Sequence, residues 1–186
     1  MTHVLRVEGG QPLHGTISVR GAKNFVSKAM VASVLGQSPS QLRNVPLIRD
    51  VDVVTNMLAA HGVDVDFDED EGVLLLDPAN VETAAVGDID ALSGSSRIPI
   101  LFCGPLLHRL GEAFIPELGG CAIGDRPIDF HLEGLRRFGA EVIKESGGVR
   151  LIAPAGGLKG TAISLPYPSV GATEQILLTA VQADGI

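Results

Sequence analysis

A glycine-rich stretch, residues 118–131, places a thiol and a guanidinium just ahead of a helix. It reads LGGCAIGDRPIDFH, with Cys121 inside the loop and Arg126 near its end. Apolar residues at helical spacing predict a helix over 128–138 that stops at Gly139. Amides at a helix start and a guanidinium both attract phosphate or carboxylate oxygens, and the same field favours a thiolate. The pattern therefore predicts an anion site in which Cys121 serves as acid, base or nucleophile.

Plain connectors can also be rich in glycine, and most lone cysteines are small buried hydrophobes. Cys103 falls on the apolar face of a predicted helix, which indicates a core position. The acidic run 64–71 lacks the ligand order of a calcium loop and fits a solvated hairpin. His131, in the first turn of its predicted helix, could touch a ligand, but a local polar contact is the more common role of a histidine there. The two cysteines have no zinc or disulfide spacing, so no metal or cofactor is predicted.

The charge and composition limit the partners. The 186 residues include 14 Lys and Arg against 22 Asp and Glu, for a net charge of −8, which disfavours a nucleic-acid surface. The sequence contains neither a membrane-spanning apolar run nor a signal pattern, so a cytoplasmic protein without membrane partners is expected. With so few cations, those in glycine-rich loops mark the places for anionic ligands.

The sequence repeats itself. Asp52, Leu58, Gly62 and Val65 lie at one constant offset from Asp129, Leu135, Gly139 and Val142. The first unit is predicted to contain a strand over 16–20, a helix over 25–36, a strand over 41–45, a helix over 50–61, and a hairpin of 63–67 with 73–76. Asp50 is predicted to cap the second of these helices. The second unit repeats this order: a strand or lead-in over 89–96, a helix over 97–108, a strand over 112–115, a helix over 128–138, and a hairpin of 140–144 with 149–152.

A third unit begins but does not finish. Residues 158–161 echo 13–16, residues 171–174 echo 21–24, and one helix over 174–183 follows. The sequence therefore predicts an α/β (α+β) fold of repeated βαβαββ units with a truncated third unit, as in a piece of a longer protein. The alternative is a natural domain of two and a half repeats, which would leave a helix face and a sheet edge uncovered.

Each unit places polar residues at the start of its first helix. These residues are Lys23 and Asn24, then Ser95, Ser96 and Arg97, then the segment 169–173. Equivalent loops of a repeat protein lie on one face, so they are expected to converge with Arg126 into a phosphate-binding pocket. The backbone of 169–171 can approach a diphosphate closely because Gly171 has no Cβ.

At these positions the sequence resembles the enolpyruvyl transferases, and within them the branch that uses UDP-N-acetylglucosamine in peptidoglycan synthesis. The shikimate branch of the family is a poorer match, with Gly-Ser-Lys-Ser in place of this chain's Gly-Ala-Lys-Asn and no cysteine loop. The motifs cover nearly the whole chain: GAKN at 21–24, PLL at 105–107, GGCAIGDRPIDFH at 119–131, GL at 134–135, GA at 139–140 and PSVGATE at 168–174.

The resemblance implies two similar lobes, each an inside-out, barrel-like α/β assembly of three units, with the active site between them. Residues 22–186 would form one lobe, incomplete at its C-terminus. Residues 1–21 would form an N-terminal strand that packs with the second lobe, which this chain lacks.

The resemblance also implies a reaction: the enolpyruvyl group of phosphoenolpyruvate moves to the 3'-hydroxyl of UDP-N-acetylglucosamine, and phosphate leaves. Cys121 would donate the proton, and Lys23, Arg97 and Arg126 would neutralise the phosphates. Asn24 would hold the sugar. The uracil pocket would comprise Pro127, Ile128, Asp129 and Phe130, and the diphosphate would meet Ser169, Val170 and Gly171, beside Tyr167 and Pro168.

Tyr167 stands where many members of the family have a basic residue, so that contact departs from the pattern. The carboxylate that deprotonates the hydroxyl would belong to the second lobe, so the isolated chain is expected not to turn over. Two alternatives remain: a non-catalytic module that binds a UDP-sugar, and a 3-phosphoshikimate 1-carboxyvinyltransferase.

Overall fold

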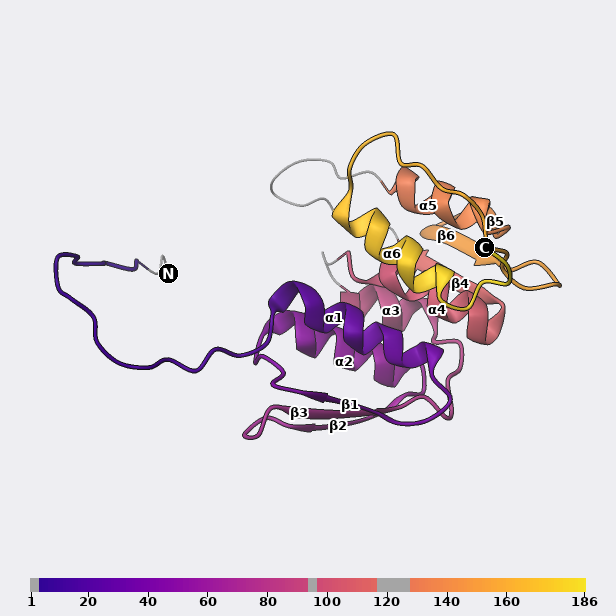
Figure 1. The fold of residues 1–186 in the computed structure, drawn as a ribbon. Coiled ribbons are helices and arrows are strands. Elements are labelled where there is room, and N and C mark those ends of the chain that lie inside the picture. The colour runs from indigo at the N-terminus through magenta and orange to yellow at the C-terminus, as the bar shows by residue number, and fades with distance from the viewer. Residues whose placement is uncertain (1–3, 94–96, 117–127) are drawn as a thin grey trace.

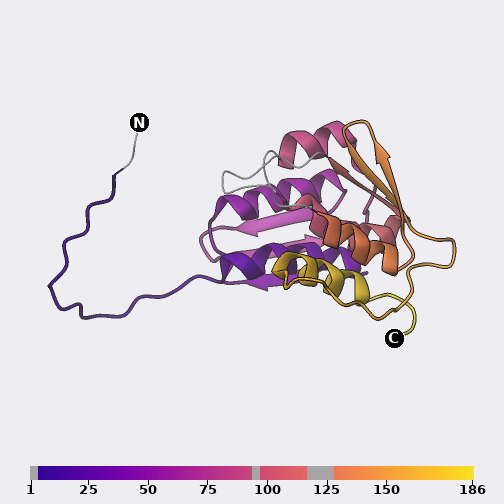
Figure 2. The same cartoon turned by 90° about the horizontal axis from the view of Figure 1, so that it is seen from above.

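The helices of this chain gather between two small antiparallel sheets, and the N-terminal segment extends away from them (Figures 1 and 2). The structure is a computed structural model and describes residues 4–93, 97–116 and 128–186. The chain enters the body at residue 21, where the Gly21 amide donates to the Asn44 carbonyl at 2.8 Å.

The first unit has the predicted order of helices and strands after its first strand. Its three-stranded sheet has the order β1-β3-β2, with both pairings antiparallel. Apolar residues at i, i+3 and i+4 turn one side of each helix toward the core. The elements are α1 (Lys23–Ala32), the 3₁₀ turn η1 (Ser33–Leu35), β1 (Ser40–Arg43), α2 (Arg49–Ala60), β2 (Asp64–Asp68) and β3 (Val73–Asp77).

The second unit builds the same kind of sheet, in the order β4-β6-β5. The two helix stops also correspond, because Gly62 and Gly139 both adopt left-handed backbone conformations, with φ of +76° and +98°. The order helix, strand, helix, strand, strand therefore recurs in both units, which confirms the repeat except for the strand predicted to open each unit. The elements are α3 (Val86–Ser93), α4 (Pro99–Leu110), β4 (Glu112–Pro116), α5 (Asp129–Arg137), β5 (Glu141–Glu145) and β6 (Gly148–Ile152), followed by α6 (Val170–Ala180) of the third unit.

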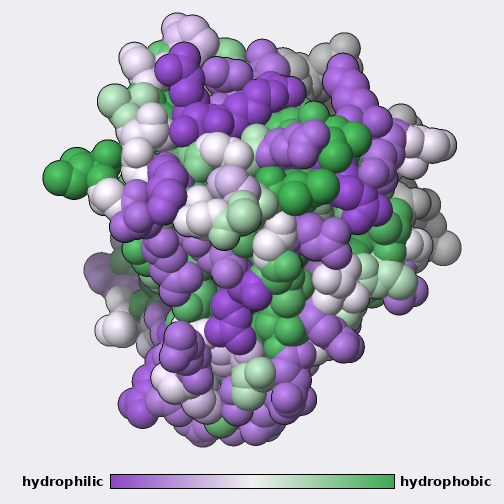
Figure 3. All heavy atoms as spheres, turned by 90° about the vertical axis from the view of Figure 1, so that its right-hand side faces the viewer, coloured by the Kyte–Doolittle hydropathy of each residue, from purple (hydrophilic) through white to green (hydrophobic). Residues whose placement is uncertain are grey.

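The core lies where the helices meet the inner faces of the sheets. In the first sheet, Leu74 and Leu76 of β3 are fully buried. In β2, exposed aspartates alternate with partly buried apolar residues, the two-residue period of a strand with one face in water. On the side shown in Figure 3, the lower part is mostly hydrophilic and hydrophobic residues gather above it. The acidic run 64–71 is thus the solvated hairpin that the sequence predicts. Cys103 is buried as predicted, and burial raises the pKa of its thiol.

Helix α6 joins the two units to the start of the third. A Cβ on Gly104 of α4 would lie 2.2 Å from the Thr179 hydroxyl oxygen, so α4 and α6 approach closely at this glycine. The same helix packs on α5, where a Cβ on Gly134 would lie 2.9 Å from Ile176. Because α6 contacts both helices, the residues at its start are held in a fixed position relative to α4 and α5.

Two predictions about strands are wrong. Residues 16–20 form no strand within this chain, because no strand in the described part pairs with them, and their pairing with a second lobe stays a prediction. Residues 89–93 are not a strand or lead-in, since they belong to α3, which packs on α2; residues 94–96 lie outside the described residues. The spacing of Val86, Ile89 and Leu92 is helical, and Ile89 is buried.

Two predictions about helix starts need correction. Asp50 does not cap α2, whose N-cap is Ile48 without a side-chain bond; Asp50 lies inside the first turn. Helix α6 begins at Val170 rather than 174, because the Ser169 hydroxyl accepts a hydrogen bond from the Ala172 amide at 3.3 Å. Arg97 therefore precedes α4, and Ser169 precedes α6, at comparable points of their units.

Among the described residues, no helix combines the length and apolar character that crossing a membrane requires.

Candidate functional site

The starts of helices α1, α5 and α6 lie on one side of the body, the side from which the N-terminal segment departs (Figures 1 and 2). An ion pair links the first two turns of α1 and α6, with Lys28 Nζ 3.3 Å from Glu174 Oε2. Helix starts carry partial positive charge, so their grouping creates a surface suited to anions. The predicted convergence concerned the starts of α1, α4 and α6 together with Arg126; Ser95, Ser96 and Arg126 lie outside the described residues, so that convergence stays a prediction.

At the start of α1, Lys23 and Asn24 are exposed. The Lys23 ammonium lies 3.5 Å from the carboxylate of Asp50 in α2, and 65% of its side chain is exposed. The cation is therefore accessible to a ligand, and its ion partner comes from α2. The sequence analysis missed Asp50 as a partner, since it assigned this residue to a helix cap.

At the start of α6, hydrogen bonds fix the segment that was predicted to meet a diphosphate. Ser169 caps the helix, and the Thr173 hydroxyl donates to the Ser169 carbonyl at 2.8 Å. Val170 is 76% exposed, and Tyr167 and Pro168 are also exposed. The backbone of this turn is therefore fixed in position and open to a ligand on its outer side.

Three predicted site residues lie around His131 of α5. Its ring packs against Gly171, where a Cβ would lie 3.5 Å from its Cε1 and 3.6 Å from its Nε2. The charges of Arg97 and Asp129 both act on the ring. Burial, followed by the Arg97 charge, lowers the pKa of His131 to about 4, and Asp129 opposes this shift. The ring is therefore neutral at physiological pH.

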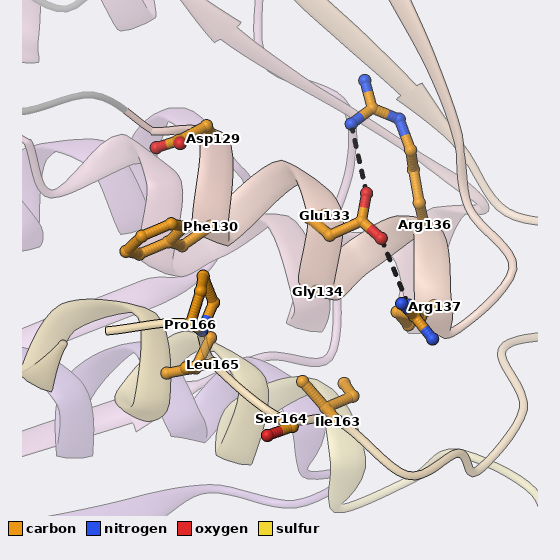
Figure 4. Close-up of a pocket in the computed structure, with 10 residues that line it drawn as sticks. All are labelled: Asp129, Phe130, Glu133, Gly134, Arg136, Arg137, Ile163, Ser164, Leu165 and Pro166. Atoms are coloured by element: carbon orange, nitrogen blue, oxygen red, sulfur yellow. Dashed lines mark hydrogen bonds and ion pairs between the residues drawn. The ribbon is translucent and has the colours of Figure 1, made fainter. Parts of the chain in front are cut away.

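Asp129 and Phe130 also line a groove of about 310 Å³ beside α5 (Figure 4). Its second wall is the segment 163–166, and Phe130 faces Pro166 across the groove. Toward the end of α5, Glu133 pairs with Arg137 at 3.1 Å and with Arg136 at 3.8 Å. The groove thus has an apolar end formed by Phe130 and Pro166 and a charged end, a shape that suits a flat ring with polar edges.

The structure brings together some predicted residues and leaves others undescribed. It groups Arg97, Asp129 and Gly171 at His131, and it places Phe130 in the adjacent groove. Ile128 is half-buried just before α5. Cys121, Arg126 and Pro127 lie outside the described residues, as do Ser95 and Ser96. Within the described part of the chain, no three His, Cys, Asp or Glu side chains are arranged to hold a metal ion.

The comparisons with known proteins agree with this fold. The family model described as EPSP synthase (3-phosphoshikimate 1-carboxyvinyltransferase) matches residues 7–186. The chain belongs to this family. Within the EPSP synthase family it is homologous to proteins named UDP-N-acetylglucosamine 1-carboxyvinyltransferase. One from Acidiphilium cryptum is 44% identical over 97% of this chain, and one from Protochlamydia amoebophila is 42% identical over 98%.

Solved structures show the fold of the EPSP synthase family. The enolpyruvyl transferase NikO from Streptomyces tendae matches 95% of this chain with a TM-score of 0.77 at 20% identity. An EPSP synthase from Acinetobacter baumannii matches 92% with a TM-score of 0.69 at 21% identity. This chain covers 40% and 39% of those two chains, and 42% and 40% of the two relatives above. It therefore spans about two-fifths of the length of the proteins it matches.

Proposed function

We propose that this chain is the nucleotide-sugar-binding part of a UDP-N-acetylglucosamine 1-carboxyvinyltransferase. The observation that carries the proposal is its identity of 41–44% to relatives of that name over at least 96% of its length. The reaction would transfer the enolpyruvyl group of phosphoenolpyruvate to the 3'-hydroxyl of UDP-N-acetylglucosamine, with release of phosphate. It is the first committed step of peptidoglycan synthesis, and we assign it to the cytoplasm.

The groove beside α5 is the proposed uracil pocket. Phe130 and Pro166 offer apolar surface to the faces of the ring, and the Asp129 carboxylate is an acceptor for its N–H. The diphosphate would lie at the start of α6, where the Ser169 cap fixes the backbone of 169–171 and the partial positive charge of the helix start favours an anion. Lys23 and Arg97 would supply positive charge, and Asn24 a contact to the sugar.

The chemical step is assigned to Cys121 with Lys23 and Arg126. In the proposed mechanism the 3'-oxygen attacks C2 of the enol while C3 takes a proton from Cys121, which forms a tetrahedral ketal. Loss of a proton from C3 and of phosphate from C2 then yields the enolpyruvyl ether. Lys23 and Arg126 would stabilise the charge that develops on the phosphate. A carboxylate from the second lobe would accept the proton of the attacking hydroxyl.

The finer architecture is part of the same proposal. Residues 22–186 would form one inside-out, barrel-like lobe whose third unit is incomplete, and residues 1–21 would pair as a strand with the second lobe. Two observations support this: the extended, exposed course of residues 4–20, and the coverage of about two-fifths of each relative. We therefore expect the chain alone to release no phosphate from the two substrates.

The second candidate is 3-phosphoshikimate 1-carboxyvinyltransferase. It is favoured by the description of the matching family model and by the likeness to an EPSP synthase structure. That structure is only 21% identical to this chain, so its likeness concerns the fold. The higher identity of the UDP-N-acetylglucosamine relatives makes their substrate the first choice.

The deciding experiment is a calorimetric titration of this chain with UDP-N-acetylglucosamine and, separately, with shikimate 3-phosphate. Saturable binding of the UDP-sugar alone supports the proposal, and binding of shikimate 3-phosphate alone supports the second candidate. If the folded chain binds neither ligand, the result would contradict a preformed half-site.

Replacing Cys121 in the full-length protein distinguishes the proposed enzyme from a non-catalytic module that binds a UDP-sugar. Loss of turnover with sugar binding retained supports catalysis. A module would show no turnover before the replacement and unchanged binding after it.

A further inference from the structure

His131 occupies an unusual position for a histidine in the first turn of a helix. Only 7% of it is exposed, and its ring fills the space between α5 and the Gly171 backbone at the start of α6. Of the residues whose charges act on the ring, Arg97 precedes α4 and Asp129 opens α5. His131 therefore lies where three segments of the proposed half-site meet.

The ring nitrogen Nδ1 of His131 is buried and has no hydrogen-bond partner. An unpaired buried polar atom destabilises a fold, and a leucine of similar volume would avoid that penalty. His131 stays neutral at physiological pH, so it keeps one N–H donor and one acceptor nitrogen available. Hydrogen bonds at ligand sites are often incomplete before the ligand binds. The Nδ1 of His131 is thus a buried polar atom without a protein partner.

We propose that His131 is a substrate-positioning residue, whose Nδ1 gains its hydrogen bond when the diphosphate of the UDP-sugar binds at the start of α6. This inference rests on the proposed function. The ring holds the first turn of α5 against Gly171, so the groove beside α5 and the turn at 169–171 keep a fixed spacing. The new hydrogen bond then stabilises the arrangement in which Arg97 and the helix starts face the ligand together.

His61 provides a matched control within the same chain. It is as deeply buried as His131, at 6% exposure, and its ring stacks on Phe102 with centroids 5.7 Å apart. Its Nδ1, however, has a backbone partner in either tautomer: when protonated it donates to the Glu82 carbonyl at 3.1 Å, and when unprotonated it accepts from the Ala84 amide at 3.3 Å. His61 follows the last residue of α2, whereas the proposed half-site lies at helix starts. A histidine with satisfied hydrogen bonds can therefore be compared with an unsatisfied one.

The test measures thermal stability without ligand and UDP-N-acetylglucosamine affinity by calorimetry, both at pH 7.5. His131→Leu is expected to raise the melting temperature by about 2–4 °C, because the unpaired nitrogen is gone, and to weaken binding roughly tenfold. His131→Asn, whose amide lies near the position of Nδ1, is expected to restore most of the affinity. His61→Leu is expected to lower the melting temperature and leave the affinity unchanged.

Wild-type affinity in His131→Leu would overturn the inference while leaving the proposed function intact. Equal losses of stability and affinity in the His131→Leu and His61→Leu variants would also overturn it, since they would show a purely structural role. If the folded wild-type chain fails to bind the UDP-sugar, the proposed half-site itself is wrong and the inference falls with it. The wild-type titration thus separates the two failures.

Discussion

The ammonium of Lys23 and the carboxylate of Asp50 lie 3.5 Å apart and join the starts of α1 and α2. The two side chains are 65% and 39% exposed, so water and salt screen their attraction. An anionic ligand at Lys23 must compete with this carboxylate. We therefore expect the pair to affect ligand binding at the proposed site more than it affects folding.

Asp50→Asn is expected to strengthen phosphoenolpyruvate binding at low ionic strength, because Lys23 loses a competing anion. Stability should change by less than about 1 kcal/mol, as for other exposed ion pairs. Calorimetry at two salt concentrations measures the effect, which should shrink in high salt. Asp52→Asn is the control, since it removes the same charge from the same turn of α2. Equal effects of the two variants would show that only the overall charge matters.

Gly171→Ala is expected to weaken UDP-N-acetylglucosamine binding about tenfold or more without unfolding the chain. The new Cβ would meet His131 at 3.5 Å, an ordinary contact, but would stand on the backbone that the diphosphate approaches. Gly87→Ala is the matched control, because Gly87 is likewise the second residue of a helix and has open space around it. Unchanged affinity in Gly171→Ala would show that the diphosphate does not bind at this turn.

Three glycine-to-alanine substitutions are expected to destabilise the chain more, the less space there is around the new Cβ. Gly104→Ala should destabilise by about 2–3 kcal/mol, because its Cβ would lie 2.9 Å from the Thr179 Cα. Gly134→Ala should have a smaller effect, since Ile176 is a side chain that can shift. Gly87→Ala should stabilise by up to about 1 kcal/mol through helix propensity. Urea unfolding measures all three, and a reversed order would contradict the close α4–α6 contact.

The stability of the chain is expected to fall as the pH drops from about 6.5 to 4. The folded-state pKa of His131 is about 4, against 6.5 as the reference, so the unfolded chain takes up the proton first. The full effect is about 3 kcal/mol, at 1.36 kcal/mol for each pH unit between the two values. His61, whose pKa is also lowered by burial, adds to the same trend. Urea unfolding at several pH values measures this dependence, and the free energy of unfolding should change less steeply with pH in His131→Leu than in the wild type.

The Cys103 thiol is expected to resist alkylation in the folded chain. It is buried in α4, and burial raises its pKa, so little thiolate forms and a reagent has no access. Mass spectrometry of a Cys121→Ser variant isolates this thiol. Modification should be slow in buffer and rapid in denaturant. Rapid modification of the folded chain would contradict the position of Cys103 in the core.

The sequence by itself determined the repeat and most of the elements. Glycine stops such as Gly62 and Gly139, and apolar residues at helical or alternating spacing, act within one or two turns of the chain, so neighbouring residues are enough to predict them. The roles of Cys121 and Arg126 likewise come from the sequence motif and remain predictions. The first strand and α3 were predicted wrongly because a strand needs a partner, and a short apolar run can form either a strand or a helix until packing selects one.

Only the tertiary structure decided which polar residues meet. Lys23 and Asp50 are on different helices, and His131 lies against Gly171 across a separation of 40 positions in the sequence numbering. No local pattern encodes such contacts, because they depend on how α4, α5 and α6 pack at Gly104 and Gly134. The sequence places cations and glycines at the helix starts. The packing of these helices brings the starts to one side of the molecule and leaves one buried histidine nitrogen without a partner.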